Sequence, residues 1–249
     1  MNEQDKRLQA QLGDLRLDYV AQNYNPLAEQ ATQKHWTPVD YLARLMDGQT
    51  ETSQQRTIQR RIKVAGFPVI KTMESFDWNY PKKINRPQVQ NLLRLGFIEQ
   101  KANVVLVGGV GLGKSHLAIA LGHAACRAGY SVRFTTAMEI INTLTDAQAT
   151  HRMKSELKKF VRPSLLCIDE VGYLPIDKLG ADLLFQVISE RYERGSIVLT
   201  TNQPYKSWPK VFNNDATLTS AVLDRLLHHA DTVVIDGKSY RMKDQIQDL

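Results

Sequence analysis

The sequence has few cysteines, few aromatic residues and no long apolar run. Two of its 249 residues are cysteine, and 8% are Phe, Trp or Tyr. Cys126 and Cys167 lie within apolar segments, so we expect reduced core thiols rather than a disulfide framework or a metal site. No stretch approaches the about 18 apolar residues of a membrane span, and no basic-then-apolar leader opens the chain. These absences predict a cytoplasmic protein with no membrane partner.

The sequence also lacks a strong excess of charge of one sign. The formal net charge is +6, and 43% of the residues are hydrophobic. This charge is compatible with a polyanionic partner but does not by itself indicate one. The length of the chain fits either one large domain or a domain with a small appendage, and we favour the second.

The first part of the chain has a helical pattern. Leucines and bulky residues recur at roughly every third or fourth position in residues 8–19 and again in residues 41–45. Thr37 followed by Pro38 is typical of a helix start. Three prolines and several aromatic residues interrupt the pattern between Gly66 and Pro87. We therefore expect a helical N-terminal domain that contacts a partner or DNA (1–66), a linker (67–87) and a core domain (88–249).

Strand and helix patterns alternate in the core domain. This alternation predicts an α/β fold, with a five-stranded parallel sheet between helices. The expected strands are 104–107, 132–135, 165–168, 197–200 and 232–235. The expected helices are 114–128, a broken pair around 138–160, 179–194 and 217–228.

A phosphate-binding loop is predicted between the first strand and the following helix. Its pattern, Gly-x-x-x-x-Gly-Lys-Ser, turns backbone N–H groups toward phosphate oxygens at a helix N-terminus. Lys114 would bridge the β- and γ-phosphates, and the Ser115 hydroxyl would ligate Mg²⁺. A chance glycine-rich turn is the alternative, which the strand and helix on either side disfavour. The predicted nucleotide-binding residues are Gly108, Gly109, Val110, Gly111, Leu112, Gly113, Lys114, Ser115 and His116.

Two carboxylates follow the third predicted strand. Asp169 would hold the metal, and Glu170 would activate a water for attack on the γ-phosphate. Two solvated carboxylates at a turn are the alternative. Asn202 ends the next strand and could hydrogen bond to the γ-phosphate or the attacking water, although asparagine is also a common turn residue.

The order of these motifs resembles that of AAA+ ATPases, and more narrowly that of the IstB-like helper ATPases of insertion-sequence transposition, which are related to DnaC helicase loaders and DnaA initiators. The resemblance spans nearly the whole chain. It rests on the stretches RRIKVAGFP, KTMESFDW, GGVGLGKSHLA, LLCIDEVGYLP, ERYERGSIVLTTN, LDRLLHH and GKSYR.

The resemblance implies further site residues. Arg225 lies at the position of the arginine finger, which completes the ATP site of a neighbouring subunit. Arg241 lies at the position of the sensor-2 arginine. Either arginine could instead pair with a carboxylate on a solvated helix. Phe76 falls near the expected adenine position, although a packing role is the alternative. Only 24 residues follow Arg225, so we expect no full C-terminal lid.

Basic residues are densest between Asp146 and Pro163. By resemblance, this stretch would contact DNA phosphates without reading bases. A charged helix that faces water is the alternative. The candidates are Arg152, Lys154, Lys158, Lys159 and Arg162, and a second group is Arg56, Arg60 and Arg61, which could instead bind a protein. His228 and His229 are left as structural because no metal-ligand spacing includes them.

The resemblance implies an ATP- and Mg²⁺-dependent ATPase that binds double-stranded DNA. It would form a head-to-tail homo-oligomer on target DNA and recruit a cognate transposase. A helicase loader is the close alternative. A small-molecule kinase is a more distant one, because Glu170 suits hydrolysis and the tail is short for a closing lid.

Overall fold

The computed structural model describes residues 3–240. The chain divides into two compact units, Met1–Arg60 and Arg61–Leu249. None of the helices in the described range is both long and apolar enough to cross a membrane.

The first unit is helical. It consists of α1 (Glu3–Asp14), α2 (Asp18–Gln33) and most of α3 (Pro38–Ala65). Its small core contains Leu12, Val20, Tyr24 and Leu45.

The start of α3 is capped reciprocally. The backbone N–H of Asp40 donates to Thr37 Oγ1, and the Thr37 N–H donates to Asp40 Oδ2, both at 3.1 Å. The Thr37 hydroxyl also donates to Asp40 Oδ2, at 2.7 Å, and this bond together with the one from the Thr37 N–H lowers the pKa of the Asp40 carboxyl. The arrangement satisfies donors that a helix start leaves free, which confirms the predicted start at this position.

The second unit contains a five-stranded parallel sheet in the order β2-β3-β4-β1-β5. Val105 of β1 pairs with Leu199 of β4 on one side and with Thr232 of β5 on the other. The strands are β1 (Asn103–Gly108), β2 (Val132–Thr136), β3 (Leu165–Val171), β4 (Ser196–Thr201) and β5 (Ala230–Ile235). All five predicted strands are confirmed.

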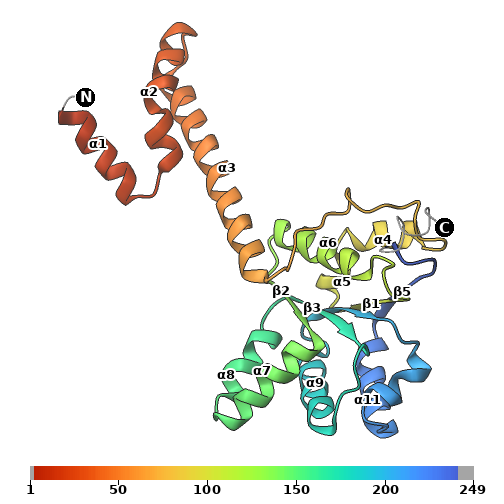
Figure 1. Cartoon of the computed structure of the whole chain (residues 1–249). Coiled ribbons are helices and arrows are strands. Elements are labelled where there is room, and N and C mark those ends of the chain that lie inside the picture. Colours follow the sequence, from red (N-terminus) through yellow and green to blue (C-terminus); the bar gives the residue numbers. More distant parts are fainter. Residues whose placement is uncertain (1–2, 241–249) are drawn as a thin grey trace, which may run out of the picture. The chain divides into compact units, whose positions relative to one another are not determined.

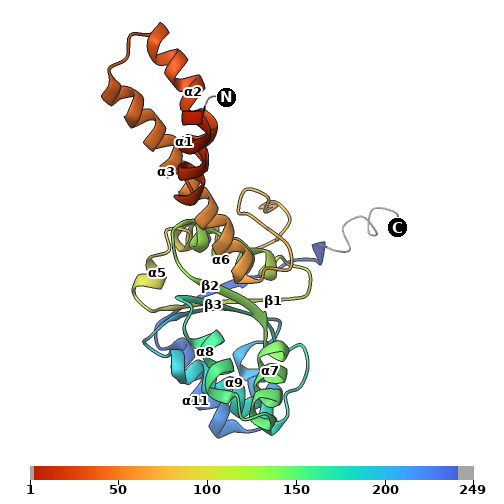
Figure 2. The same ribbon diagram turned by 90° about the vertical axis from the view of Figure 1, so that its left-hand side faces the viewer.

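Helices cover both faces of this sheet (Figure 1). One face packs against α6 (Lys114–Arg127), α4 (Arg86–Leu92) and α5 (Gly96–Glu99). The opposite face packs against α7 (Ala137–Ala149), α8 (Met153–Val161), α9 (Lys178–Arg191) and α11 (Ala216–Leu227), and Figure 2 shows the same layering from the side. The predicted α/β sandwich is thus confirmed.

Some short elements have no counterpart in the sequence prediction. They are α4, α5, the 3₁₀ turn Tyr205–Ser207 and α10 (Trp208–Val211). Helices this short show too few turns for an apolar period to stand out. After Arg225, the described residues 226–240 include the end of α11 and the strand β5, and they contain no further α-helix.

Both cysteines lie in the core, Cys126 on α6 and Cys167 on β3. Cys126 and Cys167 are fully buried free thiols. Burial raises the pKa of Cys126 to about 11 and also raises the pKa of Cys167.

Candidate functional site

The strand order brings the predicted motifs to one edge of the sheet. β4 lies between β1 and β3. Because the strands are parallel, the loop after β1, the polar end of β4 and the carboxylates of β3 emerge side by side. The three motifs are far apart in sequence, and this topology makes them neighbours.

The loop between β1 and α6 has the backbone of a phosphate cradle. Gly111 and Gly113 have φ values of +73° and +86°, a region that side chains disfavour. Gly113 is the N-cap of α6. The positive end of this helix and its free N–H groups therefore face the loop, as an anion site requires.

Two glycines of the loop are also sterically required. A Cβ on Gly108 would lie 2.3 Å from the Ile235 carbonyl oxygen, and one on Gly113 would lie 2.6 Å from Cε2 of Phe76. The loop therefore cannot accept side chains at these positions without moving its neighbours.

Lys114 and Ser115 begin α6 at the mouth of the loop. Lys114 is 3% exposed, and its Nζ donates to the Gly109 carbonyl at 2.6 Å. Its Nζ also lies 5.9 Å from the centre of the Tyr173 ring. The amine thus lies over the loop, at the place where phosphate oxygens would replace the carbonyl.

Asp169 is the hydrogen-bonding centre of the site. The Ser115 hydroxyl donates to its Oδ1 at 3.0 Å, and the Thr200 hydroxyl donates to the same oxygen. The Asp169 residue is 8% exposed. A hydroxyl and a carboxylate held together offer the hard oxygen ligands that Mg²⁺ prefers, so these residues fit the predicted ion. Thr200 is a site residue to which the sequence pattern assigned no individual role, although it lies two residues before Asn202.

Glu170 has an unusual backbone conformation. Its φ is +62°, at a shift in the β3–β4 register between Ile168 and Val171. Its N–H donates to Thr200 Oγ1 at 3.0 Å. This distortion releases Glu170 from the strand pattern, and its exposed side chain reaches the same cavity as Asp169. Strained backbone of this kind is concentrated at functional sites.

Asn202 follows β4, the strand that pairs with β3, but does not line the cavity. Its Oδ1 is buried and accepts no hydrogen bond. An amide oxygen in that state is costly unless a partner arrives, so Asn202 retains capacity to bind one.

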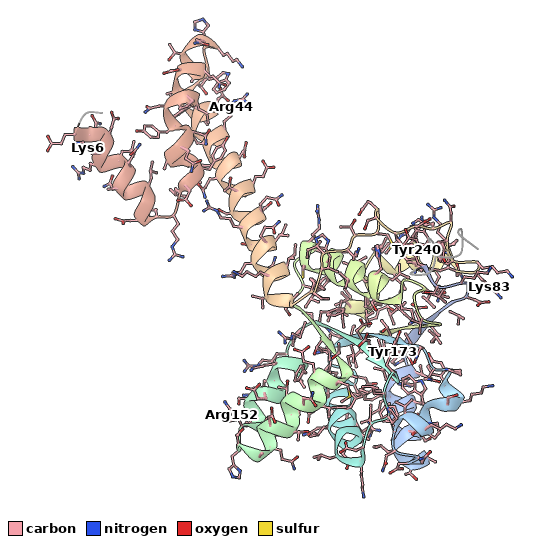
Figure 3. All side chains as sticks on the ribbon, viewed as in Figure 1. Lys6, Arg44, Lys83, Arg152, Tyr173 and Tyr240 are labelled. Carbon is pink, nitrogen blue, oxygen red and sulfur yellow. The ribbon has the colours of Figure 1, made fainter. Side chains whose placement is uncertain are left out.

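A cavity of about 440 Å³ opens over the loop. Its other wall is the segment 68–81, which includes Phe76 and Tyr80, and Tyr173 and Tyr240 also line it. Figure 3 shows the positions of Tyr173 and Tyr240. The volume and the mixed aromatic and polar lining suit a small organic ligand that carries an anionic group.

His116 fastens this segment to α6. Its Nε2 lies 2.8 Å from the Thr72 carbonyl oxygen and 3.3 Å from Ser75 Oγ. Its ring packs edge-on against Phe76, which contacts Trp78 in the same way. Burial lowers the pKa of His116. The neutral ring therefore holds Phe76 against the loop.

The remaining predicted residues lie away from the cavity. Arg225 on α11 is half-buried, and its guanidinium lies 4.9 Å from the centre of the Phe185 ring. The α8 candidates Arg152, Lys154, Lys158, Lys159 and Arg162 are all exposed, and Figure 3 shows Arg152 on the outer side of the α7–α8 pair. Arg56 pairs with Asp18 and, like Arg60, belongs to the first unit, whereas Arg61 belongs to the second. Arg241 lies outside the described residues.

Comparisons with known proteins agree with this geometry. The family model described as IstB-like ATP binding protein matches residues 10–248. The chain is 37% identical over 231 residues to an ATP-binding protein of insertion sequence IS5376 from Geobacillus stearothermophilus, covering 93% of this chain and 92% of that protein. It is 38% identical over 239 residues to one of insertion sequence IS232 from Bacillus thuringiensis subsp. berliner, covering 96% and 95%.

Solved structures share the fold. The replication initiator DnaA bound to AMPPCP and single-stranded DNA matches with a TM-score of 0.55 at 21% identity, covering 71% of this chain and 54% of that one. The DnaC helicase loader matches with a TM-score of 0.52 at 19% identity, covering 64% and 98%. The second unit therefore has the P-loop AAA+ fold. With a family match over nearly the whole chain, this protein belongs to the family of IstB-like ATP-binding proteins and is an AAA+ ATPase of that kind.

Proposed function

We propose that this ATPase is an ATP-dependent switch that assembles on target DNA and recruits the transposase of its insertion sequence. Its relatives are ATP-binding proteins of insertion sequences, which supports a role in transposition over the helicase-loader and kinase alternatives.

We assign the chemistry to the residues at the sheet edge. The loop N–H groups and Lys114 bind the β- and γ-phosphates, and Phe76 lies near the base. Ser115 and Asp169 would hold Mg²⁺, which neutralises phosphate charge when bound. Glu170 orients and activates the attacking water, and Asn202 either donates from its Nδ2 to the γ-phosphate or accepts on its Oδ1 from that water.

One observation carries the proposal for assembly. The described residues that line the cavity include two cations, Lys71 and Lys114, and no arginine. Charge that develops around the transferred phosphoryl group needs a further cation for full stabilisation. We assign that role to Arg225 of a second copy, so that turnover requires head-to-tail contact between subunits.

Mixing two inactive variants tests this assignment. Arg225→Ala protein retains a complete loop, and Lys114→Ala protein retains the finger. We expect each alone to be nearly inactive and the mixture to recover part of the duplex-stimulated ATP turnover. An active Arg225→Ala variant, or a mixture that co-assembles without any recovery, would refute the shared site.

Binding of the purified transposase, and not of a replicative helicase, to the ATP-bound assembly tests the partner.

A further inference from the structure

Away from the nucleotide site, the described residues contain one group of side chains whose ligand atoms lie close enough together to bind a metal ion. Glu193, His228 and His229 each offer a ligand atom, and these atoms lie within 4.8 Å of one another. All three side chains are exposed. The two histidines are adjacent in sequence, whereas Glu193 comes from the turn after α9. Only the fold therefore brings the third ligand to the pair.

The segments that carry these residues are held by buried hydrogen bonds. Asn103, at the start of β1, donates from its Nδ2 to the Leu226 carbonyl at 2.9 Å and from its backbone to the His229 carbonyl at 2.7 Å. Its Oδ1 accepts from the Ile197 N–H at 2.9 Å. The same buried amide thus ties the end of α11 to the start of β4, which follows the Glu193 turn.

The Glu193 turn is held at its base as well. Arg191 accepts both the Arg194 and Gly195 N–H groups on its carbonyl, and its guanidinium donates to the Ser196 carbonyl at 2.7 Å. A Cβ on Gly195 would lie 2.6 Å from that guanidinium. The turn is therefore tightly constrained, and little order remains to be imposed when an ion binds.

Tyr192 orients one of the imidazoles. Its hydroxyl lies 2.8 Å from His228 Nδ1, which leaves Nε2 available to a ligand. Metal-binding histidines commonly have their other ring nitrogen fixed by such a hydrogen bond. The ring of His229 packs against that of His228 at a tilt of 42°, with 4.1 Å between the ring centres.

We propose that Glu193, His228 and His229 bind a divalent transition-metal ion. Two imidazoles and one carboxylate are a ligand set for Zn²⁺ and related ions, with further positions left to water. The ion cross-links the turn after α9 to the junction of α11 and β5. This site lies toward the amino ends of β4 and β5, whereas the nucleotide site lies at the carboxyl ends. The clamped helix α11 carries Arg225 one turn before His228.

Calorimetric titration of the untagged, nucleotide-free full chain with Zn²⁺ tests the proposal. We expect one ion per chain, and at least about tenfold weaker binding in His228→Ala, His229→Ala and Glu193→Gln. Tyr192→Phe should weaken binding by about 10- to 100-fold through the lost orienting bond. His35→Ala and His151→Ala remove exposed histidines elsewhere and should bind as the unsubstituted protein does.

Two outcomes would overturn the proposal of a metal site. One is binding that the three ligand substitutions leave unchanged, and the other is binding that His35→Ala or His151→Ala weakens equally. Thermal unfolding provides a second measurement, because Zn²⁺ should raise the Tm of the unsubstituted protein and not that of His229→Ala. His229→Ala and Glu193→Gln leave the Tyr192–His228 hydrogen bond in place, so these two variants should fold even if His228→Ala, which removes that bond, does not.

Discussion

Lys114 combines deep burial with a hydrogen bond that a nucleotide would replace. Its Nζ is held at the Gly109 carbonyl, inside the loop that the backbone shapes. We expect Lys114→Ala to lose ATP binding by at least about 100-fold, since a charge-assisted bond to phosphate contributes about 1.5–3 kcal/mol and the loop loses its cation. Equilibrium binding of a fluorescent ATP analogue measures this.

Lys178→Ala is the matched control, because Lys178 is likewise the first residue of a helix and is exposed. It should bind the analogue normally. ATP affinity that survives Lys114→Ala would contradict the assignment of the loop.

Gly113 joins two constraints, a left-handed backbone and the contact with Phe76. A methyl group there costs about 1–2 kcal/mol in the left-handed backbone conformation and also pushes the Phe76 ring away from the loop. We therefore expect Gly113→Ala to lower both the free energy of unfolding in urea and the nucleotide affinity. In Gly96→Ala the new methyl would meet no atom within 4 Å, so both quantities should change little. Equal effects of the two substitutions would argue against the steric account.

At the scale of elements, α8 presents exposed cations and is anchored at its end. Lys159 pairs with Glu156 at 2.6 Å, so Lys154 and Lys158 are the better test of DNA binding. We expect Lys154→Ala/Lys158→Ala to weaken duplex binding and to reduce the slope of log K against log salt by about 1 for each lysine–phosphate ion pair that is removed. Anisotropy of a labelled duplex between about 50 and 200 mM salt measures this slope.

The control pair Lys206→Ala/Lys210→Ala removes the same charge from two other exposed positions. It should leave the slope unchanged. If both pairs reduce the slope alike, the effect is one of net charge and not of α8.

Arg191 anchors the end of α8 to α9 and β4. It is 1% exposed and donates to five carbonyl groups, those of Phe160, Val161, Pro163, Ser164 and Ser196. Burial lowers its pKa to about 10, so it stays charged at neutral pH. Arg191→Leu should cost about 3 kcal/mol or more of unfolding free energy in urea, because the buried carbonyls lose their partner.

Arg194→Leu is the contrasting substitution. That side chain is 75% exposed and pairs with Glu190 at 3.5 Å. Its loss should change the unfolding free energy by no more than about 0.5 kcal/mol. A small effect at Arg191 would mean that water replaces it at the carbonyls.

At the scale of the whole molecule, the two thiols report on opening of the core. With a pKa of about 11 for Cys126, about one thiol in a thousand is ionised at pH 8, and both sulfurs are fully buried. Reaction with a thiol reagent should therefore require unfolding. ATP at 100 times its Kd should slow the reaction by about 100-fold, because it binds only the folded state. Lys114→Ala protein should show no such protection. Rapid labelling at a rate independent of ATP would contradict the expectation that the thiols react only after unfolding.

The motifs were predictable because each is local. Gly108 to Ser115 shapes a loop through backbone freedom, and the strands are visible as short apolar runs. Asp169 and Glu170 were predictable as strand-end carboxylates. Short helices such as α4 and α10 were not, since their apolar period is incomplete. Thr200 and Arg191 were missed because a hydroxyl or a guanidinium gains its role only from what surrounds it.

By itself, the sequence determined the type of fold, the family and the phosphate loop, because periodicity, glycine placement and motif spacing depend on neighbouring residues. The tertiary structure decided which distant groups meet. Strand order places the Thr200 hydroxyl against the Asp169 carboxylate, and the folding of the Glu193 turn against α11 places a carboxylate beside two histidines. The reason is physical: such contacts depend on how strands are ordered and turns packed, which no local pattern encodes.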